Sequence, residues 1–170
     1  RGELAFKGRV DAWDAADMSS DISLTGPDGA ELMRQFGLEV PDVGQTGAGS
    51  LTLSAMGKSK DGLAVVLRGA MGPTEVTLNG SATLTRGAAP GAELDLDLKS
   101  PDVGSLLVLS GNVVQGVMGS TPADVAAHLS IGNRKVRVNR IEGKLAEVPT
   151  VGDIDIDFAP AVPKVTGNLS

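Results

Sequence analysis

The sequence predicts a mainly β protein with short helices, in which repeated antiparallel strands form a curled sheet. Three observations predict this fold. Apolar and polar residues alternate with a period of two through most of the chain. Glycines recur on the apolar side of that alternation, where they would let a sheet bend: Gly8, Gly69, Gly80 and Gly167. A punctuated stretch, PDGAELMRQFG at 27–37, returns as PDVGSLLVLSG at 101–111.

The alternation predicts strands that have one solvent-exposed face and one buried face. In ELAFKGRV, Leu4, Phe6, Gly8 and Val10 share one side. One-sided polarity is typical of antiparallel sheets, because parallel sheets are covered on both faces. Further apolar faces are predicted at Ile22 and Leu24; Leu63, Val65, Leu67 and Met71; Val76, Leu78, Ala82 and Leu84; Leu94, Leu96 and Leu98; Val125, Ala127, Leu129 and Ile131; and Ile154, Ile156 and Phe158.

Two places depart from simple alternation. Val136 and Val138 are even whereas Ile141 and Leu145 are odd, which predicts a bulge near Asn139 and Arg140. In LNGSA (78–82), Asn-Gly is a strong hairpin signal. A hairpin would mix the two faces, so we predict a continuous strand in which Gly80 allows bending or a close approach.

The punctuated stretches predict two short helices, near 27–36 and 101–110. Pro fits the first helical turn, Asp suits the positive end of the dipole, and Gly can end the helix. Gly26 and Ser100 stand in the cap positions. The same offset, 74 from Pro27 to Pro101, also carries Ile22 to Leu96, which indicates one short helix per repeat of about 74 residues.

The repeat predicts the organisation of the chain. We expect a first β-rich repeat at 1–77, a second at 78–164 and the start of a third at 165–170. Apolar-x-Gly-x-apolar segments at 6–10, 78–82 and 165–169 support these divisions. Because the chain starts at Arg1 and ends inside an alternating pattern, we expect it to be an excised piece of a longer protein.

Composition excludes several classes of function. A net charge of −6 is the wrong sign for binding a phosphate backbone, so nucleic acid is not an expected partner. The aromatic residues are Trp13, Phe6, Phe36 and Phe158 alone, too few for stacking bases or sugars. Without cysteine, disulfides and thiolate metal sites are excluded. No apolar run approaches the ~20 residues of a membrane-spanning helix.

No catalytic motif is present, and we expect neither an enzyme nor a cofactor. His128 is the only histidine and falls on a polar strand face, as a solvated residue would. The sharpest polar features are two acidic ladders: Glu93, Asp95 and Asp97, and Asp153, Asp155 and Asp157. Calcium binding and glycoside hydrolysis are alternatives, but calcium needs oxygens that converge from a turning backbone. We therefore interpret the ladders as solvated faces that protect sheet edges.

The helices are too short to cover the apolar surface of the predicted sheet. A helix ~10 Å wide covers about two strands spaced ~4.8 Å apart. The remaining apolar surface can be hidden by curling the sheet, by closing a sandwich, or by filling a groove with an apolar ligand. The candidate groove residues are Leu63, Val65, Leu67, Val76, Leu78, Leu94, Leu96 and Leu98. An ordinary closed core is the alternative for the same residues.

The succession DISLTGPDGAELMRQFGLEVPDVG, an apolar-x-Gly-x-apolar strand, and ELDLDLKSPDVGSLLVLSG resembles the AsmA family of bacterial envelope proteins. The resemblance spans essentially the whole chain, because ELAFKGRV and KVTGNLS are similar to the family's x-G-x strands. It implies a U-shaped apolar groove like that of bridge-like lipid transfer proteins, a periplasmic location, and a parent protein anchored in the inner membrane by a segment missing here.

The resemblance also implies a non-catalytic function. The groove would bind or guide phospholipid acyl chains, in support of outer-membrane lipid homeostasis or assembly, with other envelope proteins as further partners. The alternative is a structural β-repeat scaffold that contacts protein partners through an edge strand without binding lipid. A third hypothesis, an envelope polysaccharide enzyme, predicts a cleft with convergent carboxylates near His128.

Overall fold

The computed structural model describes residues 3–10, 17–35, 47–58, 61–84, 89–103, 121–160 and 162–170. These residues form ten strands and one short helix, α1 (Gly29–Gln35). The strands are β1 (Glu3–Val10), β2 (Asp17–Gly26), β3 (Gly49–Lys58), β4 (Gly62–Met71), β5 (Thr74–Thr83), β6 (Gly91–Ser100), β7 (Ala123–Gly132), β8 (Lys135–Leu145), β9 (Val148–Asp157) and β10 (Lys164–Leu169). The protein is therefore mainly β, as the alternation predicts.

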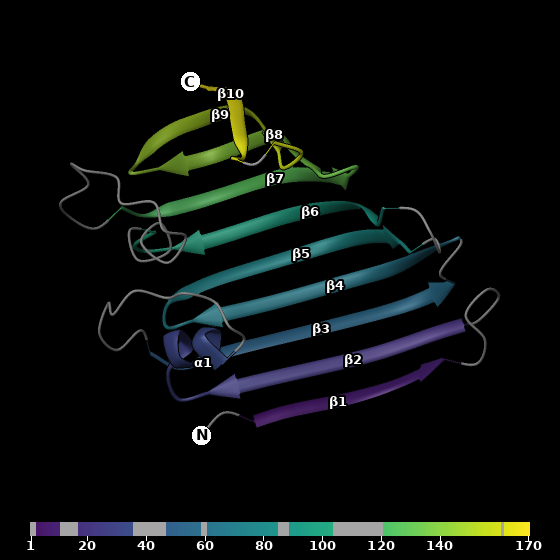
Figure 1. Ribbon diagram of the computed structural model, residues 1–170. Helices are drawn as coiled ribbons and strands as arrows, with labels where there is room; N and C mark the ends of the chain where they lie inside the picture. The colour runs from purple at the N-terminus through teal and green to yellow at the C-terminus, as the bar shows by residue number, and fades with distance from the viewer. Residues whose placement is uncertain are drawn as a thin grey trace.

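All ten described strands belong to one antiparallel sheet in which spatial order equals chain order (Figure 1). β1 and β10 lie at opposite ends of this order and do not pair with each other, so the sheet is open. Successive strands need only short connections to pair in this way, because each neighbour in sequence is also the neighbour in space. Figure 1 shows the sheet twisting from β1, with β9 and β10 turned out of the plane of the middle strands.

The register places the alternating apolar residues on one side of the sheet. One row of paired residues runs Phe6, Ile22, Leu53, Leu67, Leu78, Leu96 and Ala127 from β1 to β7. A second row runs Leu63, Ala82, Ala92, Ile131, Val136, Ile156 and Val165 from β4 to β10. We call the side of the sheet that carries these two rows the apolar face, and the opposite side the polar face.

Both predicted departures from alternation are confirmed. β5 runs without a break through Asn79 and Gly80, so LNGSA is a continuous strand. The pairing of β8 with β9 shifts register between Val138 and Ile141, and Arg140 has a φ of 53°. This bulge returns Ile141 to the apolar face, where it is buried, after the alternation has slipped by one residue.

Helix α1 begins later than the sequence predicts. The structure starts it at Gly29, and the Asp28 carboxylate accepts a hydrogen bond of 2.9 Å from the Ala30 N–H. Asp28, rather than Gly26, is therefore the capping residue. A carboxylate satisfies a free N–H at a helix start, which the hydrogen side chain of glycine cannot do. Residue 36, the end of the predicted helix, lies outside the described residues.

The helix packs on the apolar face at one end of the sheet. It contacts β2 and β3, and Ala30 is almost fully buried. A Cβ atom at Gly29 would lie 2.9 Å from the Met71 sulfur, and one at Gly49 would lie 2.7 Å from the Gly29 Cα. Paired glycines thus let the helix backbone approach the sheet, and α1 covers only this end of the apolar face.

The two halves of the sheet repeat the same backbone contacts. The Gly29 N–H donates to the Gly47 carbonyl at 2.9 Å, and the Val103 N–H donates to the Thr121 carbonyl at 2.8 Å. The Gly72 N–H donates a hydrogen bond to the Ala48 carbonyl at 3.0 Å, and the Ala146 N–H donates one to the Pro122 carbonyl at 2.8 Å. In both cases the second pair lies 74 positions after the first: residue 103 follows residue 29 by 74 positions, and residue 146 follows residue 72 by 74 positions.

Strand bounds follow the same offset. β2, β3 and β5 map onto β6, β7 and β9, with starts at 17 and 91, 49 and 123, and 74 and 148. Because the sheet is continuous, no gap separates the halves, and the divisions at 77/78 and 164/165 fall inside β5 and β10. Those divisions remain predictions. The second predicted helix, near 101–110, lies outside the described residues beyond Val103.

Two of the four predicted glycines lie where the sheet bends. A Cβ atom on Gly80 would collide with the Glu93 carbonyl oxygen of β6, and one on Gly167 would collide with the Asp153 carbonyl oxygen of β9. Both glycines belong to the apolar face, so the neighbouring backbone rises on that side and the sheet curls toward it. Gly8 and Gly69 instead lie beneath side chains, those of Phe6 and Val76.

Candidate functional site

The eight predicted groove residues lie together on the apolar face of three adjacent strands. β4 supplies Leu63, Val65 and Leu67; β5 supplies Val76 and Leu78; β6 supplies Leu94, Leu96 and Leu98. At the centre, Leu78 is paired with Leu67 on one side and Leu96 on the other. The alternation alone brought these residues to one face, because a period of two puts every second side chain on the same side of a strand.

Most of these residues are half-buried. Leu63 and Leu94 are buried, with exposed fractions of 3% and 8%, whereas the other six keep intermediate exposure. No large described side chain is fully buried, since Ala30 of α1, with an exposed fraction of 1%, is a small residue. Toward the first edge the apolar face is open, with Leu4 63% and Phe6 68% exposed. The face is thus an accessible apolar surface in its central and edge regions.

The apolar face carries no charged side chain at any described position of the ten strands. Its polar residues are hydroxyls, and the buried pair Thr74 and Ser100 satisfies itself through a hydrogen bond of 2.7 Å. A surface of this kind is complementary to an apolar ligand, because no buried charge would have to lose its water.

Sequence reasoning missed the contribution of β3. Leu51 and Leu53 lie on the apolar face and pair with Leu24 and Ile22 of β2. The signal was present in LTLSA at 51–55, where apolar residues alternate with Thr and Ser. Leu51 and Leu53 extend the candidate surface from β4 toward the edge strand β1.

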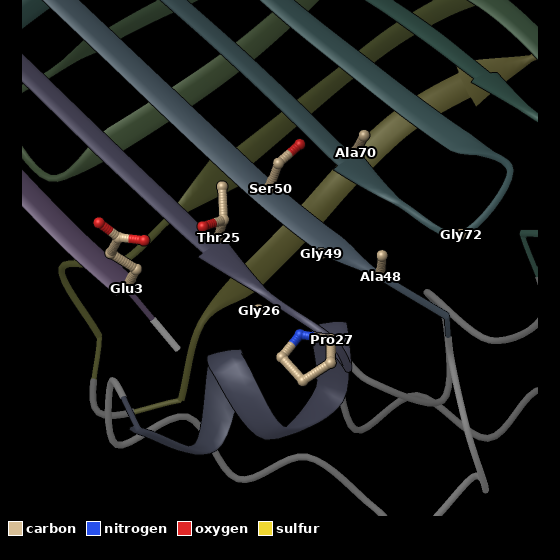
Figure 2. A pocket seen from close by; sticks show the side chains of 9 residues that line it. All are labelled: Glu3, Thr25, Gly26, Pro27, Ala48, Gly49, Ser50, Ala70 and Gly72. Carbon is tan, nitrogen blue, oxygen red and sulfur yellow. The ribbon is translucent and has the colours of Figure 1, made fainter. Parts of the chain in front are cut away.

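Two hollows lie on the polar face rather than on the apolar face. The larger has a volume of about 500 Å³ and follows the ends of β1 to β4, at the end of the sheet where α1 packs on the opposite face (Figure 2). Glu3, Thr25, Ser50 and Ala70 form one row of paired residues along it, and their side chains rise on the same side. The smaller, of about 240 Å³, lies among charged residues that include Lys135, Arg137 and Asp155. None of the eight predicted groove residues lines either hollow.

His128 is not an isolated solvated residue. Its Nδ1 lies 2.8 Å from Asp95 Oδ1 and its Nε2 lies 3.0 Å from Glu93 Oε2, both on the neighbouring strand β6. The Ser130 hydroxyl donates to the same Glu93 oxygen at 2.6 Å. Hydrogen bonds to Asp95 and then to Glu93 raise the pKa of His128, and the bonds from Ser130 and His128 lower the pKa of Glu93.

The acidic ladders lie on interior strands, so the predicted role in edge protection is wrong. β6 and β9 are each paired on both sides. Their carboxylates face basic groups of the neighbouring strands instead: Asp155 lies 2.8 Å from Arg137 Nε, and Asp157 lies 3.4 Å from Lys135 Nζ. Such exposed cross-strand ion pairs stabilise a sheet modestly and fix its register.

The described residues contain no cluster of three or more His, Asp or Glu side chains arranged to hold a metal ion. Nor do they contain a helix long and apolar enough to cross a membrane. The chain matches no family model, no curated protein and no solved structure. The most extensive candidate surface on the described residues is therefore the apolar face.

Proposed function

We propose that the chain binds phospholipid acyl chains on its apolar face, as a non-catalytic segment of an AsmA-like periplasmic protein. The observation that carries the proposal is the continuous, half-exposed and uncharged apolar face across the described strands. Transfer of each CH₂ group of an acyl chain from water to such a surface is favourable by roughly 0.8 kcal/mol.

The dimensions of the sheet support this ligand class. Ten strands spaced ~4.8 Å apart extend for roughly 43 Å, whereas one leaflet of a bilayer's ~30 Å hydrocarbon core is about 15 Å thick. The face is therefore long enough for more than one acyl chain. The charged headgroup would remain in water, because the apolar face offers it no partner.

Location and anchoring belong to the same proposal. Under it the parent protein is held in the inner membrane, the described sheet lies in the periplasm, and lipid passes along the curled apolar face toward outer-membrane assembly. The two Pro-Asp stretches support this assignment through their resemblance to the AsmA family. The recurrence of backbone contacts after 74 residues supports the repeated architecture that the proposal requires.

Lipid extraction and native mass spectrometry test the proposal. After incubation with phospholipid vesicles, we expect the protein to retain phospholipid, and Leu78→Lys to lose it, because a charge would stand at the centre of the apolar face. Thr77→Lys is the matched control, since Thr77 lies on the polar face of the same strand. Circular dichroism checks that both variants fold. If the wild type retains no lipid, or Leu78→Lys retains as much as the wild type, the proposal fails.

A second candidate is a scaffold that contacts protein through a sheet edge. It is favoured by the two strands, β1 and β10, that pair on one side only within the described sheet. This function predicts a protein that binds no lipid and forms complexes through backbone pairing at an edge. The lipid-retention experiment distinguishes the two, because substitutions at Leu78 would leave edge pairing unchanged.

A further inference from the structure

Two basic side chains approach the same carboxylate oxygen on the polar face of the interior strands. His128 Nδ1 on β7 lies 2.8 Å from Asp95 Oδ1 on β6, and Arg140 Nη2 on β8 lies 3.9 Å from the same atom. The first distance is that of a hydrogen bond, whereas the second is too long for one. The imidazole therefore binds this oxygen, and the guanidinium lies close enough to take its place.

Deprotonation of His128 removes one of its two hydrogen bonds, because a neutral imidazole has a single N–H. Glu93 keeps a donor without the ring, since the Ser130 hydroxyl donates to it at 2.6 Å. Among the described residues, Asp95 has a hydrogen bond from His128 alone. The Asp95 carboxylate is thus the one that gains most from a second cation when the ring becomes neutral.

We propose that His128 and Arg140 form a pH-operated exchange at Asp95. While the ring is protonated, it binds Asp95 and repels the nearby guanidinium. After the ring loses its proton, Nε2–H remains bonded to Glu93, Nδ1 releases Asp95, and Arg140 closes to hydrogen-bond distance of that carboxylate. The directions of the pKa effects agree with this competition: the hydrogen bond to Asp95 raises the pKa of His128, and the charge of Arg140 lowers it.

The other charged side chains that face His128 from its neighbouring strands do not compete for Asp95: Glu93 and Asp97 on β6, and Arg137 and Glu142 on β8. An ionised carboxylate only accepts hydrogen bonds, so the three acids cannot donate to Asp95. Arg137, the remaining cation, is bound elsewhere, because its Nε lies 2.8 Å from Asp155 Oδ1 of β9. The exchange therefore involves His128 and Arg140 without a third cation of the described residues.

The β8 bulge connects this exchange to the apolar face. Arg140 has a φ of 53°, and its backbone N–H donates a hydrogen bond to Asp153 Oδ1 on β9 at 3.1 Å. The left-handed conformation is unfavourable for a residue with a side chain, so this bond helps to hold the bulge in place. Ile141 follows directly and is buried on the apolar face with an exposed fraction of 8%. Movement of the Arg140 side chain toward β6 therefore acts on the residue that positions Ile141.

An NMR titration of the wild-type protein without lipid tests the exchange. We expect the His128 ring, the Arg140 Nε–H group and the Ile141 methyl groups to shift with one common midpoint as the pH rises. The order parameter of the Arg140 Nε–H bond should increase above that midpoint, because the guanidinium becomes bound. Ile22 on β2 is the reference, since it lies far from the bulge, and its methyl signals should not shift. Different midpoints for His128, Arg140 and Ile141 overturn the proposal.

Substitution of Arg140 gives a second measure. Arg140→Gln should raise the pKa of His128, because it removes the cation that repels the imidazolium. Arg137→Gln is the matched control: it removes the same charge from the same strand and face but leaves the exchange intact, so the pKa of His128 should stay where it is. Equal increases in the two variants, or no increase in Arg140→Gln, overturn the proposal. Lipid binding enters neither readout, so failure here leaves the proposed function standing.

Discussion

His128 has the most distinctive environment of any single described residue on the polar face. A neutral imidazole has one N–H, but both ring nitrogens of His128 lie within 3.0 Å of a carboxylate. Only the protonated ring can donate to Asp95 and Glu93 together, so the raised pKa follows from the geometry. Arg140, whose guanidinium lies 3.9 Å from Asp95, opposes this effect by repelling the imidazolium.

We expect the pKa of His128 to lie above the ordinary 6.5, because its hydrogen bond to Asp95 is the largest cause of the shift. In the variant Asp95→Asn the pKa should fall toward 6.5. Because the pKa of His128 is raised in the folded protein, its protonation stabilises the fold. This contribution to the free energy of unfolding is complete below pH 6.5 and is lost as the pH rises through the folded-state pKa. An NMR titration measures this directly, since the chain has one histidine.

Asp97→Asn is the matched control for that titration. Asp97 lies on the same strand and face but is opposite Ala126 rather than His128. If Asp95→Asn and Asp97→Asn shift the pKa equally, a general effect of net charge explains the result and the direct hydrogen bond does not.

The sequence could not predict these contacts at His128, although it placed the residue on the polar face. The alternation of β6 and β7 fixes which face each side chain occupies, but the pairing of residue 95 with residue 128 depends on the register between strands. Register follows from how all the strands stack. The same limit explains why Asp28 was not recognised as the cap of α1: several residues before the helix have polar groups, and the structure selects one.

At the scale of elements, strands were predicted well because their signal is local. Apolar and polar residues alternate with a period of two within each strand segment. Even the bulge in β8 was visible in the sequence, because the apolar positions change from even to odd near Arg140. Strand β3 was missed although LTLSA alternates, because its apolar run is short and lies after a glycine-rich segment. The predicted second helix cannot be compared, as it lies outside the described residues.

The turn between β8 and β9 has a sequence that does not suit its backbone. Between β8 and β9, Ala146 and Glu147 have φ values of 51° and 65°, in the left-handed region where a side chain is unfavourable. The corresponding turn between β4 and β5 has Gly72 at a φ of 56°, a conformation that glycine adopts without steric cost. The second turn therefore stores strain that the first avoids.

We expect Glu147→Gly to raise the free energy of unfolding by about 1 kcal/mol, because glycine removes the steric cost of the left-handed conformation. Glu147→Ala should change it by less than about 0.5 kcal/mol, since alanine keeps the Cβ atom. Urea denaturation compares the two variants. An equal gain in both would mean that loss of the negative charge, and not relief of backbone strain, is responsible.

At the scale of the whole molecule, the curl of the sheet decides whether the apolar face is concave. Five apolar-face glycines of the described strands have no room for a Cβ atom, because the backbone of an adjacent strand occupies that space: Gly57, Gly80, Gly143, Gly152 and Gly167. Four of these five glycines lie on β5, β8, β9 and β10, and Figure 1 shows β9 and β10 turned out of the plane of the middle strands. The curvature of the sheet therefore depends on specific glycine positions and is not distributed evenly over the strands.

Gly80 tests this account of the curl, because it lies on an interior strand. We expect Gly80→Ala to lower the free energy of unfolding by about 1–3 kcal/mol, since its Cβ atom would collide with the Glu93 carbonyl and β6 cannot move away without breaking its pairing with β7. Gly132→Ala is the control: a Cβ atom there meets nothing within 4 Å, so the substitution should be neutral or slightly stabilising.

Gly167→Ala should cost less than Gly80→Ala, because β10 is an edge strand and can shift outward to relieve the same kind of collision. Chemical denaturation ranks the three variants. The order Gly80, Gly167, Gly132, from most to least destabilising, is what a glycine-dependent curl requires. If Gly80→Ala were as stable as Gly132→Ala, the sheet would be able to flatten at β5 without loss. The apolar face would then not be held concave, and the geometric support for a lipid-guiding surface would be removed.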